Sequence, residues 1–288
     1  MNTRQRYWNI LCWNIRGING VEKWDALKKK IEESTCAIIC LQETKRESFD
    51  HRFIRNFVPR RFDKYDFIPS VGASGGIIVI WNSTIFNGVT IEKHSFAMRL
   101  SFTSLHNMEQ WSLINLYGPC QEPARSDFIS WLRNLQIDPL ENWMILGDFN
   151  FYRSLEDRNR PGGNVQDIFI FNDVIGHLGL VELPIKGRSY TWSNMQKNPL
   201  LEQLDWFFTS INWTTHYPNT MVQPLARITS DHIPCKISIG TSIPRSNIFR
   251  FENFWPLLPG FFETVTSCWQ KPNQYPEIAQ YISFKLKL

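Results

Sequence analysis

Short apolar runs recur from about Trp8 to Ile239, and they constrain the fold more than any other feature of the sequence. Runs of about four to eight residues that are rich in Ile, Val, Leu and Trp are typical of β-strands. Several are apolar throughout, which favours strands that are buried on both faces. The predicted strands include Trp8–Asn14, Ala37–Gln42, Gly76–Trp81, Arg99–Thr103, Trp111–Tyr117, Trp143–Phe149, Asp205–Thr209 and Cys235–Ile239.

Helical patterns separate several of these runs. In Val21–Glu33 one face is apolar, and Lys28–Lys30 lie largely outside it on a solvated face. The apolar face consists of Trp24, Leu27 and Ile31. The mixture of strands and helices predicts an α/β sandwich with sheets inside and helices outside. Similar apolar stripes occur at Pro123–Gln136 and Val165–Leu178.

The pattern of runs and stripes weakens after about Gly240, where proline and aromatic residues become frequent. The aromatic segment Phe249–Trp255 and the prolines around it indicate a linker rather than a packed domain. The chain shows no internal repeat and no low-complexity tract. We expect one domain over residues 1–241 and a linker-like tail over residues 242–288.

The composition excludes several classes of protein. Apolar residues make up 43% and charged residues 20% of the chain, which argues against disorder. No apolar run approaches the roughly 20 residues that span a bilayer, and Met1–Tyr7 lacks the apolar core of a signal peptide. The cysteines show no zinc-binding spacing, and most lie in or beside apolar runs, which indicates buried thiols in a reducing compartment. We therefore expect an intracellular protein.

The net charge is only +4, with a pI near 8.7. This balance permits a polyanionic partner but does not require one, because a general electrostatic attraction to nucleic acid would need a larger positive charge. If nucleic acid binds, a local basic groove must provide the contacts.

Polar side chains stand at the ends of several predicted strands, where α/β proteins usually place their sites. Asp148 and Asn150 come at the end of Trp143–Phe149. Because side chains alternate along a strand, we expect both to point to the same side, where they could hold and orient a water molecule. The alternative is an ordinary strand-end turn, in which Asp and Asn are common.

Glu43 leaves the predicted strand Ala37–Gln42 and is a candidate Mg²⁺ ligand, because this ion takes one or two carboxylates together with water. The alternative is an acid at a helix N-terminus, which the helix dipole favours. Asn14 ends the first predicted strand and could ligate a metal or fix Glu43. Tyr117 ends another strand, and its hydroxyl could donate to a phosphate oxygen.

Asp231 and His232 directly precede the run that ends at Ile239. The pair could place one carboxylate on a metal and one imidazole on a phosphate oxygen, whereas a lone histidine is more often structural. Asp205 opens another strand and could orient an imidazole across the sheet, as the third member of many triads does. The alternative for Asp205 is a capping or turn acid.

Taken in order along the chain, these residues resemble the motifs of the endonuclease/exonuclease/phosphatase superfamily, which includes DNase I and the apurinic endonucleases. The match covers about residues 7 to 240, and its ordered motifs are far more specific than one short motif. The resemblance implies a DNase I-like α/β fold, a four-layer sandwich in which two packed, mostly antiparallel β-sheets are flanked by helices. It also implies a metal-dependent phosphodiesterase.

Longer phrases narrow the resemblance to the endonuclease domain of plant LINE-type non-LTR retrotransposons. The tail Phe249–Trp255 is similar to the start of the linker toward reverse transcriptase. The chain stops before any polymerase motif, so we expect a truncated element or a host-retained fragment, with any reverse transcriptase supplied elsewhere. The phrases that carry this likeness are Glu156–Gly163, Leu178–Leu183, Tyr190–Asn194 and Leu204–Phe207.

The resemblance implies a role for each motif residue. Glu43 would be the main Mg²⁺ ligand, supported by Asn14 and Asp231, and Mn²⁺ could substitute for Mg²⁺. Asp148 would align or deprotonate the attacking water, and Asn150 would hold the geometry of the site.

The remaining motif residues would act on the phosphate. His232, oriented by Asp205, would contact the scissile phosphate, and Tyr117 would contact it too. Such donors and a metal stabilise the charge that builds on the phosphorus oxygens during hydrolysis. Weaker candidates for contacts to DNA phosphates, which could equally be solvated surface, are Lys45, Arg16, Arg125, Arg158, Arg160 and Arg188.

Three positions depart from the relatives. Cys120 stands where apurinic endonucleases tend to carry Asn, and Glu202 where their abasic pocket has an aromatic residue. Both departures argue against abasic-site specificity. Gln203 stands where Arg is usual in both groups, which bears on substrate contact or turnover.

The function predicted from these features is a Mg²⁺-dependent DNA endonuclease that nicks one strand and leaves a 3′ hydroxyl. We expect a monomer that acts in the nucleus. Two alternatives remain at this point: an apurinic-type repair endonuclease, and a catalytically silent relic that only binds nucleic acid. The fold alone does not choose, because it also hosts phosphatases and other phosphodiesterases.

Overall fold

A computed structural model of the chain describes residues 3–72, 74–138, 140–244, 256, 258–270 and 280–282. The chain divides into two units, one over Arg4–Ile243 and one that joins Met1–Thr3 to Pro244–Leu288. In the second unit, helix α6 spans Phe261–Trp269. The predicted boundary after residue 241 and the linker character of the tail stay predictions, and Phe249–Trp255 lies outside the described residues.

Two six-stranded sheets form the larger unit. The first sheet has the order β13-β14-β1-β2-β4-β3, with bounds Met221–Pro224, Cys235–Pro244, Thr3–Asn14, Ile38–Gln42, Ser74–Trp81 and Lys64–Val71. The second has the order β5-β6-β7-β8-β12-β9, with bounds Phe86–His94, Ala97–Ser104, Gln110–Tyr117, Trp143–Asp148, Asp205–Thr209 and Val181–Glu182. A separate antiparallel pair consists of β10, Trp192–Ser193, and β11, Leu201–Glu202.

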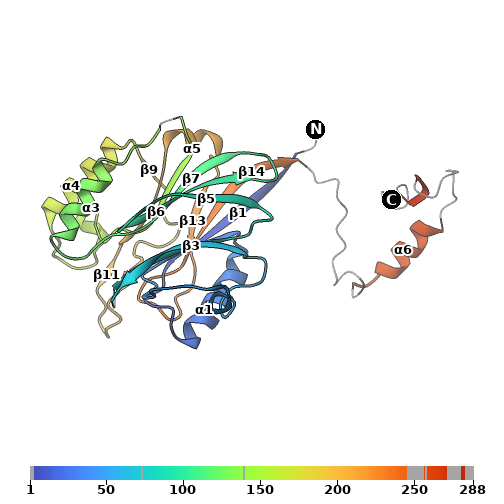
Figure 1. Cartoon of the computed structure of the whole chain (residues 1–288), viewed down its shortest axis with the longest axis horizontal. Helices are drawn as coiled ribbons and strands as arrows, with labels where there is room; N and C mark the ends of the chain where they lie inside the picture. Colours follow the sequence, from blue (N-terminus) through green and yellow to red (C-terminus); the bar gives the residue numbers. More distant parts are fainter. Residues whose placement is uncertain are drawn as a thin grey trace. The chain divides into compact units, whose positions relative to one another are not determined.

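The helices cover the outer faces of the two sheets (Figure 1). Helix α1, Val21–Ser34, and the short α2, His51–Ile54, pack on the first sheet. Helices α3, Ala124–Arg133, and α4, Val165–His177, pack on the second. Two short elements complete the unit, helix α5, Ile211–His216, and a 3₁₀ turn, Leu155–Asp157.

Strand β2 shows why an apolar run suits this architecture. Ile38 and Cys40 belong to the core between the two sheets, whereas Ile39 and Leu41 belong to the core between the first sheet and helix α1. Side chains alternate along a strand, so a strand buried on both faces must be apolar at every position. The four-layer sandwich predicted from the resemblance is therefore confirmed. Its strand pairs are mostly antiparallel, and the pairs β1–β2 and β7–β8 are parallel.

The sequence does not predict β3 or β5, which are the edge strands of their sheets. Most of their side chains are at least partly exposed, so neither strand shows an apolar run. Strand β3 also contains Pro69, which lacks the N–H that an interior strand would need for its ladder. Edge position therefore removes the pattern on which the sequence-based prediction depends.

The predicted solvated face of α1 is wrong at Lys30. This side chain is 1% exposed, and its ammonium lies 2.6 Å from Glu33 Oε2. The aliphatic stem of a lysine can be buried while its charged end reaches a partner nearer the surface. Lys28, in contrast, is exposed, as predicted.

The cysteines agree with the prediction of buried free thiols. Cys12, Cys36, Cys40 and Cys235 are buried, and none of the six is in a disulfide. Among the described helices, none combines the length and the hydropathy that a membrane-spanning segment requires.

Candidate active site

The carboxyl ends of the two parallel strand pairs, one in each sheet, meet at one end of the sandwich. In the first sheet, β1 ends at Asn14. In the second, β7 ends at Tyr117, which aligns with Asp148 at the end of β8, and β12 begins beside them at Asp205. Asn14 Nδ2 donates to Asp148 Oδ2 at 2.8 Å and so joins the two sheets. We call this end of the sandwich the site end.

Asp148 is 1% exposed and accepts several hydrogen bonds. Besides Asn14, the backbone N–H of Asn150 donates to Asp148 Oδ1 at 3.1 Å. The expected strand alternation through Asn150 is wrong, because β8 ends at Asp148 and Asn150 has a φ of 55°. This left-handed turn folds Asn150 back over Asp148, and its Nδ2 donates to the carbonyl of Gly118 at 2.7 Å. The two side chains therefore meet through a turn rather than through strand geometry.

His232 lies between two buried carboxylates. Its Nδ1 is 2.8 Å from Asp205 Oδ2, and its Nε2 is 3.5 Å from Asp148 Oδ2. Trp13 Nε1 donates to the His232 carbonyl at 3.2 Å, which ties this segment to β1. Because an ionised carboxylate only accepts hydrogen bonds, this geometry favours a proton on both ring nitrogens.

The charges of this group shift its protonation. Burial alone would lower the pKa of His232, but the charges of Asp205 and Asp148 and the hydrogen bond to Asp205 raise that pKa to about 9. Burial raises the pKa of Asp148, although His232 and the hydrogen bond from Asn14 oppose this change. A buried acid and imidazole with shifted pKa values are typical of groups that move protons in an active site.

Asp148, Asp205 and His232 also offer ligand atoms within 4.8 Å of one another, a spacing that a metal ion could use. Their contacts, however, place both ring nitrogens of His232 against carboxylate oxygens, Nδ1 at 2.8 Å from Asp205 and Nε2 at 3.5 Å from Asp148. A metal ligand must present a lone pair instead of a proton. The arrangement of this trio is therefore suited to holding protons between its members.

Glu43 and Asp231 are the other carboxylates of the site end. Glu43 follows β2 with a φ of 52°, and its Oε1 lies 2.9 Å from Lys45 Nζ. Asp231 Oδ2 accepts a hydrogen bond from Trp192 Nε1 at 2.9 Å and forms an ion pair with Arg16. Carboxylate oxygens of this kind are the ligands that Mg²⁺ prefers. Each of these two carboxylates also has a cationic neighbour.

Asn14 has a different neighbour from the one predicted. Its Oδ1 accepts the backbone N–H of Arg16 at 3.1 Å, and its Nδ2 donates to Asp148. Asn14 therefore contacts Asp148 and Arg16 rather than Glu43. Its part in metal binding stays a prediction.

Tyr117 faces the same set of carboxylates. Its side chain is partly buried, and burial raises the pKa of its hydroxyl, as do the charges of Glu43, Asp148 and Asp231. Tyr117 is consequently a neutral hydrogen-bond donor at any physiological pH.

Two residues that position the site were not predicted. Lys23, on α1, donates from Nζ to the carbonyls of Ile15 at 2.6 Å and Thr229 at 2.8 Å, so it links the segments that carry Asn14 and Asp231. The sequence gives no sign of this role, since Lys23 is one of several lysines on an amphipathic helix. Trp192 holds Asp231 and stands within a phrase of the predicted resemblance, which is the one signal that could have identified it.

Three of the six predicted DNA contacts are close to the site residues. Arg16 and Lys45 are the cationic partners of Asp231 and Glu43. Arg125 donates to the Asn150 carbonyl at 2.9 Å and pairs with Asp167 at 2.7 Å. Arg125 therefore supports the turn of Asn150 and is not an open surface cation.

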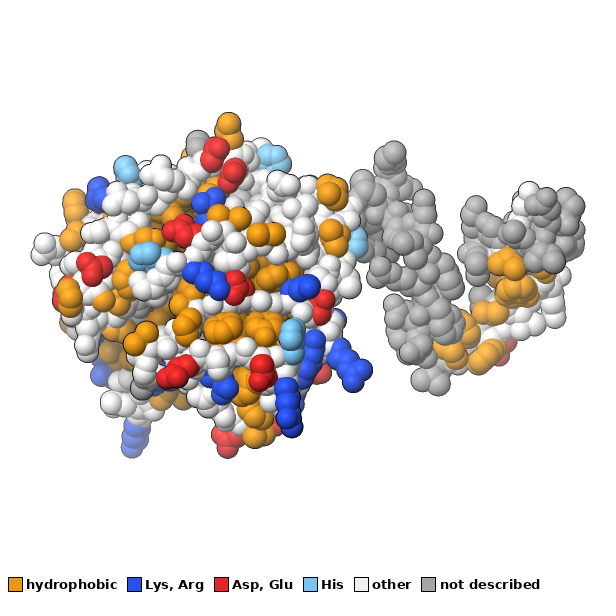
Figure 2. All heavy atoms as spheres, in the orientation of Figure 1, with side chains coloured by type: hydrophobic (Ala, Val, Ile, Leu, Met, Phe, Trp, Pro, Cys, Tyr) orange, Lys and Arg blue, Asp and Glu red, His pale blue; other side chains and the backbone are white. Residues whose placement is uncertain are grey.

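The other three predicted DNA contacts lie outside this group. Arg158 Nε is 2.9 Å from the buried carboxylate of Glu202, and Arg160 donates to the Asn198 carbonyl. Both residues tie the turn after β8 to the β10–β11 pair. Arg188 is exposed in the segment before β10. On the face shown in Figure 2, basic and acidic side chains are interspersed, in keeping with the small net charge.

A cleft of about 620 Å³ adjoins Tyr117. The β3–β4 hairpin and the segment after β7 form its walls, with Val71, Pro119 and Cys120 among the lining residues. Glu122 is the single charged side chain in this lining. The cleft therefore suits uncharged surface, such as a sugar or a base, better than a phosphate.

A four-layer sandwich with these buried acids and this imidazole at its strand ends defines a hydrolase of the nuclease and phosphodiesterase class. The sequence pattern of the Endonuclease/Exonuclease/phosphatase family matches residues 11–232, and the chain belongs to this family. Members of the family depend on a metal, and the acid–imidazole cluster described above lies within the matched residues.

Solved structures share the fold at low sequence identity. An AP endonuclease from Leishmania major is 18% identical, with a TM-score of 0.60 over 81% of this chain and 88% of that chain. The endonuclease domain of TRAS1, a telomere-specific non-LTR retrotransposon, is 12% identical, with a TM-score of 0.59 over 81% of this chain and 98% of that domain. An AP endonuclease from Archaeoglobus fulgidus is 15% identical, with a TM-score of 0.61 over 80% and 98% of the two chains.

A transposon protein is similar in sequence. An uncharacterized 149 kDa protein of transposon TX1 from Xenopus laevis is 25% identical over 169 residues, which are 56% of this chain. The match spans only 13% of the length of that relative. The similarity therefore concerns only a small part of the larger protein.

Proposed function

We propose that this chain is a Mg²⁺-dependent DNA endonuclease of retrotransposon origin that nicks one strand and leaves a 3′ hydroxyl. One observation carries the proposal: Asn14, Tyr117, Asp148, Asp205 and His232 converge at one end of the sandwich, although they come from separate parts of the chain. Hydrolysis of a phosphodiester needs a base for water, a donor to phosphate and a counter-charge, and this end has a candidate for each.

The donor set fits a hard cation. Glu43 and Asp231 would hold Mg²⁺, because both offer carboxylate oxygens and the carboxylate of Glu43 is 15% exposed. When bound, Mg²⁺ would supply positive charge that stabilises the phosphate oxygens during hydrolysis. Mn²⁺ has similar ligand preferences and is expected to substitute.

The proton chemistry falls to Asp148. Two asparagines donate to its carboxylate, which fixes its orientation, and burial raises its pKa. A carboxylate with a raised pKa is a better base, so Asp148 is suited to take a proton from the attacking water. Asn150 holds this carboxylate and the Gly118 carbonyl together, which keeps the strand ends in register.

His232 and Tyr117 would bind the phosphate. Asp205 holds the imidazole through Nδ1, which leaves Nε2 to donate to a phosphate oxygen placed beside Asp148. The neutral Tyr117 hydroxyl would donate from the end of the neighbouring strand β7. Such fixed donors stabilise the charge that develops on the phosphate oxygens.

DNA is the substrate that the observations favour. The cations Arg16 and Lys45 lie beside the metal-binding carboxylates, where a polyanionic backbone would pass. The similarity to a transposon protein and to a retrotransposon endonuclease supports a DNA target. We accordingly propose that the protein acts as a monomer in the nucleus, together with a reverse transcriptase supplied by another chain.

The test is the nicking of supercoiled plasmid in Mg²⁺, with EDTA and the His232→Ala variant as controls. The proposal expects relaxed plasmid from the wild type and supercoiled plasmid from both controls. Religation of the product without phosphatase treatment or end repair would establish the 3′ hydroxyl. A folded wild type that leaves the plasmid supercoiled at all Mg²⁺ and Mn²⁺ concentrations contradicts the proposal and leaves a silent, nucleic-acid-binding protein.

An apurinic-type repair endonuclease is the second candidate, because two of the similar structures are AP endonucleases. One contact disfavours it. Glu202 is buried, accepts a hydrogen bond from Tyr152 at 2.8 Å and pairs with Arg158. A charged network therefore fills the position where the resemblance implies an aromatic residue in the abasic pocket of apurinic endonucleases. Cleavage of an abasic duplex that is at least about a hundredfold faster than cleavage of intact duplex would reverse this preference.

A further inference from the structure

Two cations cover the carboxylates that would hold the metal. Arg16 forms an ion pair with Asp231, and Lys45 Nζ lies 2.9 Å from Glu43 Oε1. Both cations follow a strand of the parallel β1–β2 pair within a few residues of its end. The site end therefore places one cationic side chain on each of the two acids that would bind the metal. We call these side chains, Arg16 and Lys45, the two arms.

The backbone of the two segments explains this placement. The segment after β1 runs beside the segment after β2, with Gly17 N–H donating to the Glu43 carbonyl at 2.7 Å. Arg16, Glu43 and Lys45 all have a left-handed backbone, with φ between 50° and 52°. Left-handed conformations of residues other than glycine are uncommon and are found most often at functional sites. These turns direct the two arms toward the acids instead of along the strands.

The two arms differ from ordinary internal ion pairs in their exposure. The side chain of Arg16 is 56% exposed although its partner Asp231 is 8% exposed, and that of Lys45 is 32% exposed. Each arm can therefore leave its acid and remain in water, at little desolvation penalty. The carboxylate of Asp231 cannot move as freely, because Trp192 Nε1 donates to it, and the backbone of Glu43 is fixed by its hydrogen bond from Gly17.

A third cation, Lys23, lies beside the segments that carry Arg16 and Asp231. Lys23 is bonded to two carbonyls, and its pKa is lowered first by burial, with further effects from Asp231, Arg16, Glu43 and Lys45. Lys23 is therefore within electrostatic range of both acids and both arms. A divalent ion that reaches the two acids meets carboxylates that are already paired with cations.

We infer that Arg16 and Lys45 compete with the divalent metal for Asp231 and Glu43, and that metal binding releases both arms to bind phosphates of the substrate. Metal and DNA then bind cooperatively. The metal displaces the arms from the acids, and the DNA phosphates hold the arms away from the acids that the metal needs. The protein without metal keeps its arms on its own acids and binds DNA weakly. This inference rests on the proposed function for the identity of the substrate, but its first half concerns the metal alone.

Direct titration with Mn²⁺, by calorimetry or by the electron spin resonance signal of free Mn²⁺, tests the competition without any substrate. Removal of a competing positive charge by Arg16→Gln or Lys45→Gln is expected to tighten Mn²⁺ binding by about tenfold. The matched control is Arg133→Gln, which removes the exposed pair of Arg133 with Asp173 on α3 and α4. Equal Mn²⁺ affinity in the wild type and in both site variants overturns the inference.

A double-mutant cycle locates the competition. In an Asp231→Asn background the Arg16→Gln change should have less than half of its effect on Mn²⁺ affinity, on a logarithmic scale, because the contested ligand is gone. An unchanged effect means that Arg16 acts only as a distant charge, which contradicts the proposed competition for Asp231. Thermal unfolding of each variant verifies that the fold is kept.

Binding of a short duplex at different KCl concentrations tests the release of the arms. Each phosphate contact contributes about 0.9 to the slope of log K against log salt. When Ca²⁺ replaces EDTA, the magnitude of this slope should increase in the wild type. The increase should exceed that in the Arg16→Gln/Lys45→Gln double variant by about two. The control Arg133→Gln should behave as the wild type does.

The outcomes separate this inference from the proposed function. If the slope of log K against log salt gains no more in the wild type than in the double variant, and the plasmid is still nicked, the release of the arms is rejected. The proposed endonuclease activity is then still supported. In the opposite case, the wild type neither binds nor nicks DNA, but both arm variants bind Mn²⁺ more tightly than the wild type does. This result rejects DNA as the substrate and supports the competition for the metal.

Discussion

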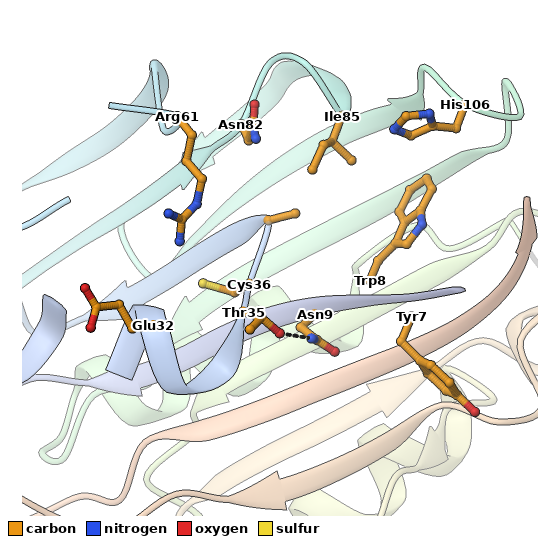
Figure 3. Close-up of a pocket in the computed structure, with 11 residues that line it drawn as sticks. Tyr7, Trp8, Asn9, Glu32, Thr35, Cys36, Arg61, Asn82, Ile85 and His106 are labelled. Carbon is orange, nitrogen blue, oxygen red and sulfur yellow. Dashed lines mark hydrogen bonds between the residues drawn. The ribbon is translucent and has the colours of Figure 1, made fainter. Parts of the chain in front are cut away.

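The two ends of the β-sandwich use their buried polar groups differently. At the site end, buried polar side chains bond to one another across the two sheets, Asn14 to Asp148 and His232 to Asp205. At the opposite end, a hollow of about 580 Å³ opens near the buried Asn9 (Figure 3). Asn9 Nδ2 donates to Ser34 O and Thr35 Oγ1 and so satisfies the C-terminus of helix α1. Polar burial therefore supports chemistry at one end and the fold at the other.

Backbone strain is distributed in the same uneven way. Among the described residues, Arg16, Glu43, Lys45 and Asn150 are non-glycine residues with positive φ at the site end. Near the hollow, Thr35 is in this conformation as the C-cap of α1, which is a common structural use. Strain that no capping role explains is a sign of function. The hollow, whose lining contains none of the site residues, is consequently the weaker candidate for catalysis.

The largest expected effect comes from Asp148→Asn, which keeps the size of the side chain but removes its charge. Without a base for the attacking water, plasmid nicking should slow by about 10³-fold or more. The matched control is Asp66→Asn on β3, whose partners are Thr90 and Lys93, away from the site residues. Nicking at more than a tenth of the wild-type rate by Asp148→Asn would remove Asp148 from the mechanism.

Gly76→Ala should give the next largest effect, now on stability. A Cβ at Gly76, which has a φ of 88°, would overlap Thr44 Oγ1 and crowd the Lys45 backbone. Overpacking together with a strained φ should lower the free energy of unfolding by about 3 kcal/mol in urea denaturation. Gly75→Ala, at a φ of 79° with open space around its Cβ, isolates the contribution of φ and should lose about 1 kcal/mol. Equal losses in the two variants would show that the Thr44 side chain moves away from the new Cβ without a further loss of stability.

The contrast between the two ends also marks what the sequence can predict. Strand ends with polar residues were predictable because apolar runs stop there, as at Asn14 and Asp148. The hydrogen bond between these two side chains was not, since it depends on how two sheets pack across 134 residues of chain. The pairing of Arg16 with Asp231 likewise joins positions 215 residues apart. Local patterns predict elements and their ends, whereas partners are decided by tertiary packing.

A third expected effect follows from the raised pKa of His232. The folded protein holds this proton up to a pH of about 9, whereas an unfolded histidine releases it near pH 6.5. The pairing therefore stabilises the protein fully below pH 6.5, and this stability is lost as the pH rises toward 9. The raised pKa of Asp148 acts in the same direction at lower pH, because the folded state again binds the extra proton.

In EDTA, the free energy of unfolding should fall by about 1.5 kcal/mol between pH 6.5 and 8. This window stays below the titration of the thiols, whose pKa values burial raises at Cys12 and Cys40. The variant His232→Gln should show a flatter profile in urea denaturation at the same pH values. A wild type whose stability rises over this window would mean that His232 is neutral in the folded protein.

The smallest effect is expected at the opposite end. Arg61 is exposed and faces the hollow together with Asn82, Ile85 and His106 (Figure 3). Its guanidinium lies 5.0 Å from the Phe62 ring, a contact that contributes little at an exposed position. Arg61→Ala should therefore change the free energy of unfolding by less than about 0.5 kcal/mol and the nicking rate by less than about twofold.

The measurement for Arg61→Ala is the initial rate of plasmid relaxation at low and at moderate salt. Low salt exaggerates distant electrostatic effects, so a general loss of positive charge would appear there and vanish at moderate salt. A tenfold loss of rate at both salt concentrations would instead mean that the hollow contacts DNA. The two ends would then share the substrate, and the division between a chemical end and a structural end would be wrong.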